Sequence, residues 1–556
     1  MDMKKILYVI TVLILAVSCI EDKSQYDYKD TVTVEFVDRI EGYSFVSGET
    51  VKLTAPISFS ETLDEKQIEE MFEITWWLDG EQIASGYNIE YTFKTVGGAP
   101  LVVKVVNKET GETYLSDVIQ TNTRNAVGWG WLALSAREGD VSSLSFIHPV
   151  SFNTAHKLED YMDGGLGTGP KGLEYYFVDG SIPSSYISGL AKVIVNQSSG
   201  SVTLDGAMLQ KDRSLADEFQ NGSEPEEDLT IIGYAWKETF YLIASAEGNL
   251  YLRYLSSEFS HIPYYGTYSN MPYAFNGGAK IGCFQGFQNV SRFVKNEDVA
   301  IMYDELNGRF FAFTNGNWYD STNPDPFRPV LIEFQHYDET QTFDPAVPKV
   351  NAMGENTKCL AIGAYEEETY IYNDQETGEE VSQSNSVYVA VIDLGGNGNF
   401  QIYRFDVSPM SYRDHTIVRN SMQAIDGPMS SESVIRMSSN FSQNPYFYYT
   451  DGDKKLYAYS MDLNVSKLIY EAPSKIVALS SSPLDCEFAS YGGNSKEPNW
   501  RLAVGQEGGN VTILDVKKKN MTSVFDNVSS NLVLTTVGGF GDIKDIVWAT
   551  NYTAEF

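Results

Sequence analysis

The chain has 556 residues, and its 75 acidic residues outnumber its 40 Lys and Arg, which gives a formal net charge of −35. Nucleic-acid binding needs a basic surface, so this charge argues against a nucleic-acid partner. A hydrophobic content of 42% is sufficient for packed cores and excludes an intrinsically disordered chain.

The first residues have the pattern of an export signal. A basic start at Lys4 leads into the apolar run Ile6–Val17, which is too short to span a bilayer comfortably. Ala16–Cys19 resembles a bacterial lipobox, in which the cysteine is lipidated and becomes the first residue of the mature protein. We therefore expect a cleaved signal peptide over residues 1–18 and a lipid on Cys19. An uncleaved signal anchor and an ordinary secretion signal are the alternatives.

Residues 19–30 form the expected tether, and they carry a family resemblance. Cys19–Tyr28, with the sequence CIEDKSQYDY, is similar to the opening of the PKD-like family lipoproteins of Bacteroidetes. The resemblance implies an immunoglobulin-like domain after the tether, and attachment by lipid to the outer membrane with the protein facing the cell exterior. It also implies an accessory role beside a TonB-dependent SusC-like transporter and a SusD-like lipoprotein.

Residues 31–123 are expected to fold as a PKD-like or immunoglobulin-like β-sandwich. Apolar and polar residues alternate along several short runs, which is the period of half-buried strands. In Glu73–Gly80 this alternation places Trp76 in the core and leaves Trp77 more exposed, and the final Asp-Gly is a hairpin signal. One short helix is expected over residues 64–72. A Trp-bearing strand in a domain of about 90 residues suits an immunoglobulin-like fold.

Residues 127–551 are expected to form a β-propeller, so that the whole fold is all-β. One pattern recurs, in which an apolar strand, a turn with Gly and an acidic or amide residue, and a second strand follow one another. Its turn glycines are Gly139, Gly248, Gly316, Gly452 and Gly508. Two intervals are near double the others, and each contains a further β-rich unit, within residues 174–204 and 359–394. The count is then seven units, which bury both faces only when they stack around an axis.

The ring is expected to close through its two ends. We predict that the strand near Trp131 pairs with the last apolar run, Ile543–Trp548. Six or eight blades remain alternatives, as does a pair of ordinary β-sandwiches. The regular turn spacing and the lack of a domain-scale linker favour the propeller.

The sequence carries no motif of a known catalytic type. None of its five histidines lies in a His-Glu-x-x-His arrangement, and it has neither a Gly-x-Ser-x-Gly elbow nor a Walker loop. We therefore predict no catalytic residue, no cofactor and no metal site. Two Gly-rich turns do carry oxygen ligands that calcium could use, on Asp393, Asn397, Asn399, Asp451 and Asp453. We interpret these as turn residues, because turn geometry demands the same residue types.

Apart from Cys19, the chain has three widely spaced cysteines, Cys283, Cys359 and Cys486. The absence of a Cys-x-x-Cys motif excludes a zinc ribbon and a thioredoxin-type site. Three buried thiols are the interpretation that we favour, since Cys is among the most buried residue types. One disulfide within this set is the alternative.

The sequence does not locate the ligand-binding residues. Aromatic residues cluster in segments 259–268 and 409–413, where they either form a binding face or cover blade edges. We expect a non-catalytic surface protein that captures or guides a peptide or glycan beside the importer. The alternatives are a structural or adhesive partner, and a glycan-active hydrolase or lyase with its site in the propeller mouth. Convergent carboxylates or arginine at that mouth would favour the enzyme, and an unfocused mouth would contradict it.

Overall fold

The computed structural model is almost entirely β, and its contacts divide the chain into two units, Met1–Arg124 and Asn125–Phe556. It describes residues 32–549 except 38–41, 47–49, 94–96, 125–129, 150, 163, 177–191, 206–208, 223–224, 226–228, 230–233, 237–239, 246, 255–265, 285–298, 315–329, 337–343, 374–379, 409–415, 439–443, 483–499 and 529. Within these residues, no helix is long and apolar enough to cross a membrane. The expected signal peptide, Cys19 and the tether lie outside the described residues.

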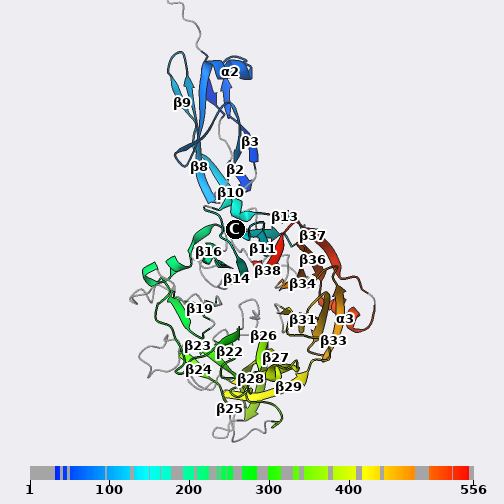
Figure 1. Cartoon of the computed structure of the whole chain (residues 1–556). Helices are drawn as coiled ribbons and strands as arrows, with labels where there is room; N and C mark the ends of the chain where they lie inside the picture. The colour runs from blue at the N-terminus through cyan, green and yellow to red at the C-terminus, as the bar shows by residue number, and fades with distance from the viewer. Residues whose placement is uncertain are drawn as a thin grey trace, which may run out of the picture. The chain divides into compact units, whose positions relative to one another are not determined.

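The first unit is a β-sandwich (Figure 1). Its larger sheet contains, in spatial order, β2 (Tyr43–Val46), β10 (Ile119–Arg124), β8 (Gly97–Asn107), β5 (Phe72–Leu78) and β6 (Glu81–Ser85), and β9 (Thr113–Leu115) also pairs with β8. Two-stranded sheets pair β1 (Val34–Phe36) with β4 (Ile57–Phe59) and β3 (Thr50–Thr54) with β7 (Asn88–Thr92). The predicted immunoglobulin-like class is confirmed.

Trp76 lies in the core of this sandwich. Its side chain is fully buried, and its indole Nε1–H donates a hydrogen bond to the carbonyl oxygen of Gly86 at 3.0 Å. Successive residues of a strand point to opposite faces of the sheet, so Trp77 lies on the other face, where it is half-buried. The alternation in the sequence predicted both positions correctly.

The expected short helix is α2 (Glu65–Met71), and it is closed at its start by a reciprocal pair of hydrogen bonds. The backbone N–H of Gln67 donates to Asp64 Oδ1 at 2.8 Å, and the backbone N–H of Asp64 donates to Gln67 Oε1 at 2.9 Å. Ile68 anchors the helix in the core. The helix ends at Phe72, whose extended backbone begins β5.

Replacing Asp64 with alanine is expected to lower the stability of α2 by about 1 kcal/mol, because an N–H at the helix start loses its acceptor. In hydrogen–deuterium exchange on the full chain, peptides that cover α2 should exchange roughly fivefold faster. Glu61→Ala, an exposed acidic position just upstream, serves as the control and should leave the rate unchanged. Equal exchange in both variants would show that the cap contributes nothing.

The second unit contains seven sheets within its described residues, and Figure 1 shows them arranged as a ring. Their strand pairs are antiparallel except for the parallel pair of β25 and β29. We number the blades in order around the ring and give the strands of each from the axis outwards. Blade 1 contains β38 (Asp542–Ala549), β11 (Gly130–Arg137), β12 (Val141–Ile147) and β13 (Thr154–Ala155), blade 2 contains β14 (Pro170–Tyr176), β15 (Lys192–Gln197), β16 (Val202–Asp205) and β17 (Lys211–Ser214), and blade 3 contains β18 (Tyr234–Trp236), β19 (Phe240–Ala244) and β20 (Leu250–Tyr254).

Blade 4 contains β21 (Ile281–Phe284), β22 (Val299–Asp304), β23 (Arg309–Thr314) and β24 (Val330–Glu333), and blade 5 contains β26 (Lys358–Asn373), β27 (Glu380–Asp393), β28 (Phe400–Ser408), β29 (Thr416–Ala424) and β25 (Gln335–His336). Blade 6 contains β30 (Ile435–Met437), β31 (Tyr446–Thr450), β32 (Lys455–Ser460) and β33 (Val465–Glu471), and blade 7 contains β34 (Ile476–Ser481), β35 (Arg501–Gln506), β36 (Asn510–Asp515) and β37 (Val533–Gly538). The predicted seven-bladed propeller is confirmed.

The ring closes within blade 1, where the last strand, β38, pairs with the first strand of the unit, β11. The predicted pairing of these two strands is confirmed, and within it Trp131 stands opposite Trp548, with the two indole rings edge to face and their centroids 5.0 Å apart. The β38 side chains pack on both neighbours: Val547 belongs to a cluster shared with blade 2, and Ile546 to one shared with blade 7.

Four of the five predicted turn glycines connect adjacent strands of a blade, and each has a positive φ. They are Gly139, Gly248, Gly452 and Gly508. Gly316 lies outside the described residues, and the described turn of blade 4 is formed instead around Gly308, between β22 and β23. The two units inferred within the long intervals correspond to blades 2 and 5.

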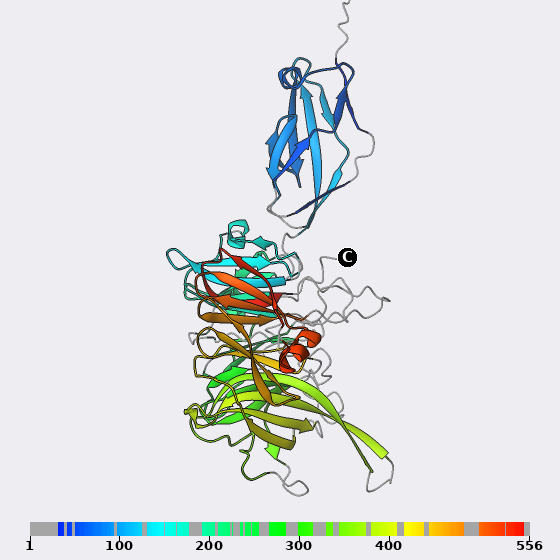
Figure 2. The same ribbon diagram turned by 90° about the vertical axis from the view of Figure 1, so that its right-hand side faces the viewer.

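Large apolar clusters fill the spaces between neighbouring blades. One joins blades 4 and 5 through side chains such as Phe310 and Phe405, and another joins blades 6 and 7. The second cluster also contains Met521 and Phe525 of α3 (Lys518–Phe525), a helix that the sequence analysis did not predict (Figure 2). Short 3₁₀ turns, η1 (Leu158–Tyr161), η3 (Ala216–Glu218), η4 (Gln220–Gly222) and η7 (Leu394–Gly396), complete the described elements.

Candidate functional site

Three charged side chains from three different blades meet at the axis of the propeller. Glu174 lies on β14, Asp545 on β38 and Arg436 on β30, which are the innermost strands of blades 2, 1 and 6. Each side chain is half-buried, and all three interact electrostatically with one another. We call Glu174, Asp545 and Arg436 the axial cluster.

Irregularities in the two inner strands accompany the carboxylates. The register of β38 against β11 shifts by one residue beside Asp545, and the register of β14 against β15 shifts just before Leu173. Such bulges re-aim side chains at the point where they interrupt regular pairing. Asp545 Oδ2 accepts a hydrogen bond from the backbone N–H of Leu173 at 2.9 Å, and its Oδ1 accepts one from the backbone N–H of Ile546 at 2.8 Å. Asp545 therefore connects blades 1 and 2 directly.

Arg436 reaches the cluster from blade 6, next to blade 7. Its Nε–H donates a hydrogen bond to the carbonyl oxygen of Leu479 at 2.9 Å, and Leu479 belongs to β34 of blade 7. This contact fixes the plane of the guanidinium group between blades 6 and 7. Four consecutive blades, 6, 7, 1 and 2, thus contribute to one polar site.

The environment of the two carboxyl groups favours their protonated forms. Burial, with the nearby charge of Asp545, raises the pKa of Glu174 to about 8, and Arg436 opposes this shift only in part. Burial also raises the pKa of Asp545, against the effects of Arg436 and of the two backbone N–H groups. Glu174 is therefore mostly protonated at neutral pH, and its carboxyl group can donate a hydrogen bond as well as accept one.

Several other buried charges in the propeller are ion-paired and have structural roles. Glu218 pairs with Arg253 and also accepts a hydrogen bond from Thr203. Asp406 pairs with Arg419 at 3.0 Å across the β28–β29 ladder. The two residues of each pair neutralise each other's charge, within one blade or between adjacent blades. We therefore do not count these pairs as ligand sites.

The oxygen-rich turns singled out in the sequence are held by their own backbone. Asp451 Oδ1 accepts from the N–H groups of Asp453 and Lys455, and Asp393 Oδ1 accepts from those of Gly398 and Asn399. Both aspartates thus stabilise the turns in which they lie.

The aromatic segments are only partly described. Residues 259–265 and 409–413 lie outside the described residues. Tyr268 is fully buried and packs against Phe219, so at this position the aromatic ring covers the blade interior and forms no binding face.

The sequence analysis did not identify the axial cluster. A usable signal was present, because Glu174 lies within an otherwise apolar run and Asp545 directly precedes the apolar residues Ile546–Trp548. In a chain with 75 acidic residues, that signal did not distinguish these two positions from others.

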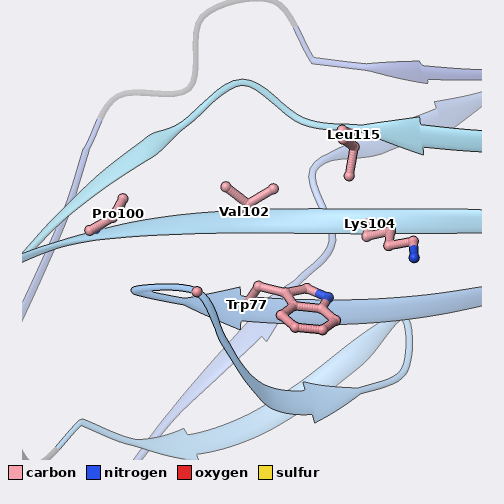
Figure 3. Close-up of a pocket in the computed structure, with 6 residues that line it drawn as sticks. Trp77, Pro100, Val102, Lys104 and Leu115 are labelled. Carbon is pink, nitrogen blue, oxygen red and sulfur yellow. The ribbon is translucent and has the colours of Figure 1, made fainter.

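The first unit has a shallow apolar pocket of about 280 Å³ on the outer face of its larger sheet (Figure 3). It is lined by Trp77, Gly80, Pro100, Val102, Lys104 and Leu115. The Trp77 Nε1–H donates to Thr75 Oγ1 at 2.9 Å, which leaves the ring beside Val102 and Lys104. The lining is almost wholly apolar and offers no group for chemistry.

Comparisons with known proteins support no family assignment. No family model matches the chain, and no curated protein does. A quinonprotein alcohol dehydrogenase-like protein from Bacteroides thetaiotaomicron has 10% identity and a TM-score of 0.43, over 93% of this chain and 97% of its own. Hsv2 from Kluyveromyces lactis has 12% identity and a TM-score of 0.31, over 64% and 77%. Likenesses at this level carry no argument about function.

Proposed function

We propose that the protein is a lipid-tethered, non-catalytic binding component on the outer face of the outer membrane, which serves a nutrient importer. The export signal, the lipobox-like segment before Cys19 and the PKD-like tether support the location and the link to a SusC-like transporter and a SusD-like lipoprotein. The observation that carries the binding role is the axial cluster, where three blades direct charged groups to one place.

The chemistry of the cluster suits a neutral, hydrogen-bonding ligand such as a glycan or a peptide. Protonated Glu174 supplies a donor, Asp545 supplies acceptors, and Arg436 supplies donors in a fixed plane.

Binding should depend on Arg436. Screening the full-length protein against glycan and peptide arrays identifies a ligand, and calorimetry then compares wild type with Arg436→Gln. Loss of a charged hydrogen-bond donor is expected to weaken binding by roughly 10- to 100-fold. The control is Glu432→Gln, an exposed acidic position near β30 whose partner is Lys475. A ligand that binds both variants as tightly as wild type would place the site elsewhere.

The importer role has a separate test. The tagged lipoprotein is purified from its own outer membrane in mild detergent, and the proteins that accompany it are identified by mass spectrometry. Near-equal amounts of a TonB-dependent transporter and a SusD-like lipoprotein are the expected result. Recovery of the protein alone would contradict the importer complex, and it would leave the proposal of binding at the axial cluster unchanged.

The second candidate is a glycan-active hydrolase or lyase, and one specific observation favours it. A carboxyl group that is protonated at neutral pH beside a second carboxylate is the arrangement used for general acid catalysis. If the ligand found above is cleaved by wild type, and cleavage is lost in both Glu174→Gln and Asp545→Asn while binding persists, the enzyme is the correct assignment. Binding without product supports the non-catalytic role.

A further inference from the structure

Two cysteines from neighbouring blades lie in one apolar cluster. Cys283 is on β21, the innermost strand of blade 4, and Cys359 is on β26, the innermost strand of blade 5. Cys359 is a buried member of the cluster between these blades, and half-buried Cys283 packs against the same cluster. They are 76 positions apart in sequence, so only the stacking of the blades brings them together.

The two thiol groups contact each other. They form a hydrogen bond with one another, and the Cys359 thiol also donates to the carbonyl oxygen of Ala361 at 3.5 Å. Both strands are held next to this contact. The hydroxyl of Tyr303, which pairs with Cys283 in the β21–β22 ladder, donates to the carbonyl oxygen of Thr357, two residues before Cys359, at 3.0 Å.

We propose that Cys283 and Cys359 are a disulfide-forming pair, which oxidation converts into a covalent cross-link between blades 4 and 5. The partner for the reaction is a small-molecule or protein disulfide. The Cys283 thiolate attacks one sulfur of that disulfide and releases the other as a thiol. The Cys359 thiolate then attacks Cys283 Sγ, releases the second thiol and leaves the Cys283–Cys359 bond. Two protein thiols are oxidised, and one external disulfide is reduced to two thiols.

The positions of the two cysteines fit this order of events. Cys283 is the more accessible thiol, so it meets the external disulfide first. Burial is the main reason that the pKa of Cys359 is raised, and this keeps Cys359 protonated and protected until its neighbour has reacted. The cross-link would lie across the ring from blade 1, whose closure is formed by strand pairing and side-chain packing (Figure 1). It would therefore strengthen the side of the ring opposite the closure.

The test uses the full chain, reduced and then incubated with oxidised glutathione. Remaining thiols are alkylated, and the protein is digested without reductant for mass spectrometry. The expected product is a linked pair of peptides that contain Cys283 and Cys359, lighter by two hydrogen atoms than the separate thiol peptides. The oxidised protein should unfold at a temperature higher by about 3–6 °C, because the cross-link restricts the unfolded chain.

Three variants give the proposal sharp outcomes. In Cys486→Ser the same linked pair should form, because the third cysteine has no part in it. In Cys359→Ser, Cys283 should retain a mixed disulfide with glutathione. In Cys283→Ser, Cys359 should remain a thiol. Full alkylation of Cys359 in oxidised wild type, or a link from Cys283 to Cys486, would overturn the proposal.

Discussion

Replacing Glu174 with glutamine is expected to make the propeller more resistant to unfolding at alkaline pH. The pKa of Glu174 is about 8 in the folded protein and near 4.5 when unfolded, so between these values the folded state holds an extra proton. The stability that Glu174 contributes is complete below the lower value and is lost as the pH rises through the upper one. Glutamine does not titrate and avoids this loss.

The effect should be large. Between pH 5 and pH 9, the free energy of unfolding of the variant should rise by roughly 2 to 4 kcal/mol relative to that of wild type, a figure reduced for the partial exposure of the side chain. The measurement is the thermal unfolding of both proteins at each pH, recorded by calorimetry. Glu432→Gln replaces a mostly exposed acidic residue and should follow wild type throughout. The same pH dependence in Glu174→Gln and wild type would mean that Glu174 ionises normally.

Replacing Trp548 with alanine is expected to destabilise the propeller by about 3 to 5 kcal/mol, the range for removing a large buried aromatic side chain. Trp548 and Trp131 are both almost completely buried and pack edge to face at the closure of the ring. The Trp131 Nε1–H also donates to the carbonyl oxygen of Ser480 at 3.3 Å, which connects the closure to blade 7. Removal of the Trp548 ring is therefore expected to weaken two contacts, the edge-to-face contact with Trp131 and the hydrogen bond from Trp131 to Ser480.

The closure can be followed locally. In hydrogen–deuterium exchange, peptides from β11 and β38 should lose protection first, while those from blades 4 and 5 should change least. Trp77→Ala serves as the control, because this ring is half-buried in the other unit and should leave propeller exchange unaltered. A Trp548→Ala protein that unfolds as a whole with uniform loss of protection would show that the closure is not the weak point of the ring.

The sequence alone determined the positions of core residues and turns and the number of repeat units. Alternation in β5 assigned Trp76 to the core and Trp77 to the other face, because the two-residue period of a strand can be read directly. Gly139, Gly248, Gly452 and Gly508 marked four turns, because positive φ is readily adopted by glycine. The repeat spacing predicted seven units, and the need to close a ring predicted that the strand near Trp131 pairs with the run Ile543–Trp548.

Only the tertiary structure decided which distant residues meet. Leu173 and Asp545 are joined by a hydrogen bond although they are 372 positions apart, and Arg436 reaches the same site across blade 7. Blade spacing, strand bulges and the direction of each inner strand fix these contacts, and none of them leaves a local period in the sequence. The same reason applies to Cys283 and Cys359, which meet because their strands are neighbours on the axis. Local patterns identify the blades, whereas the ring formed by the blades creates the axial cluster and the cysteine pair.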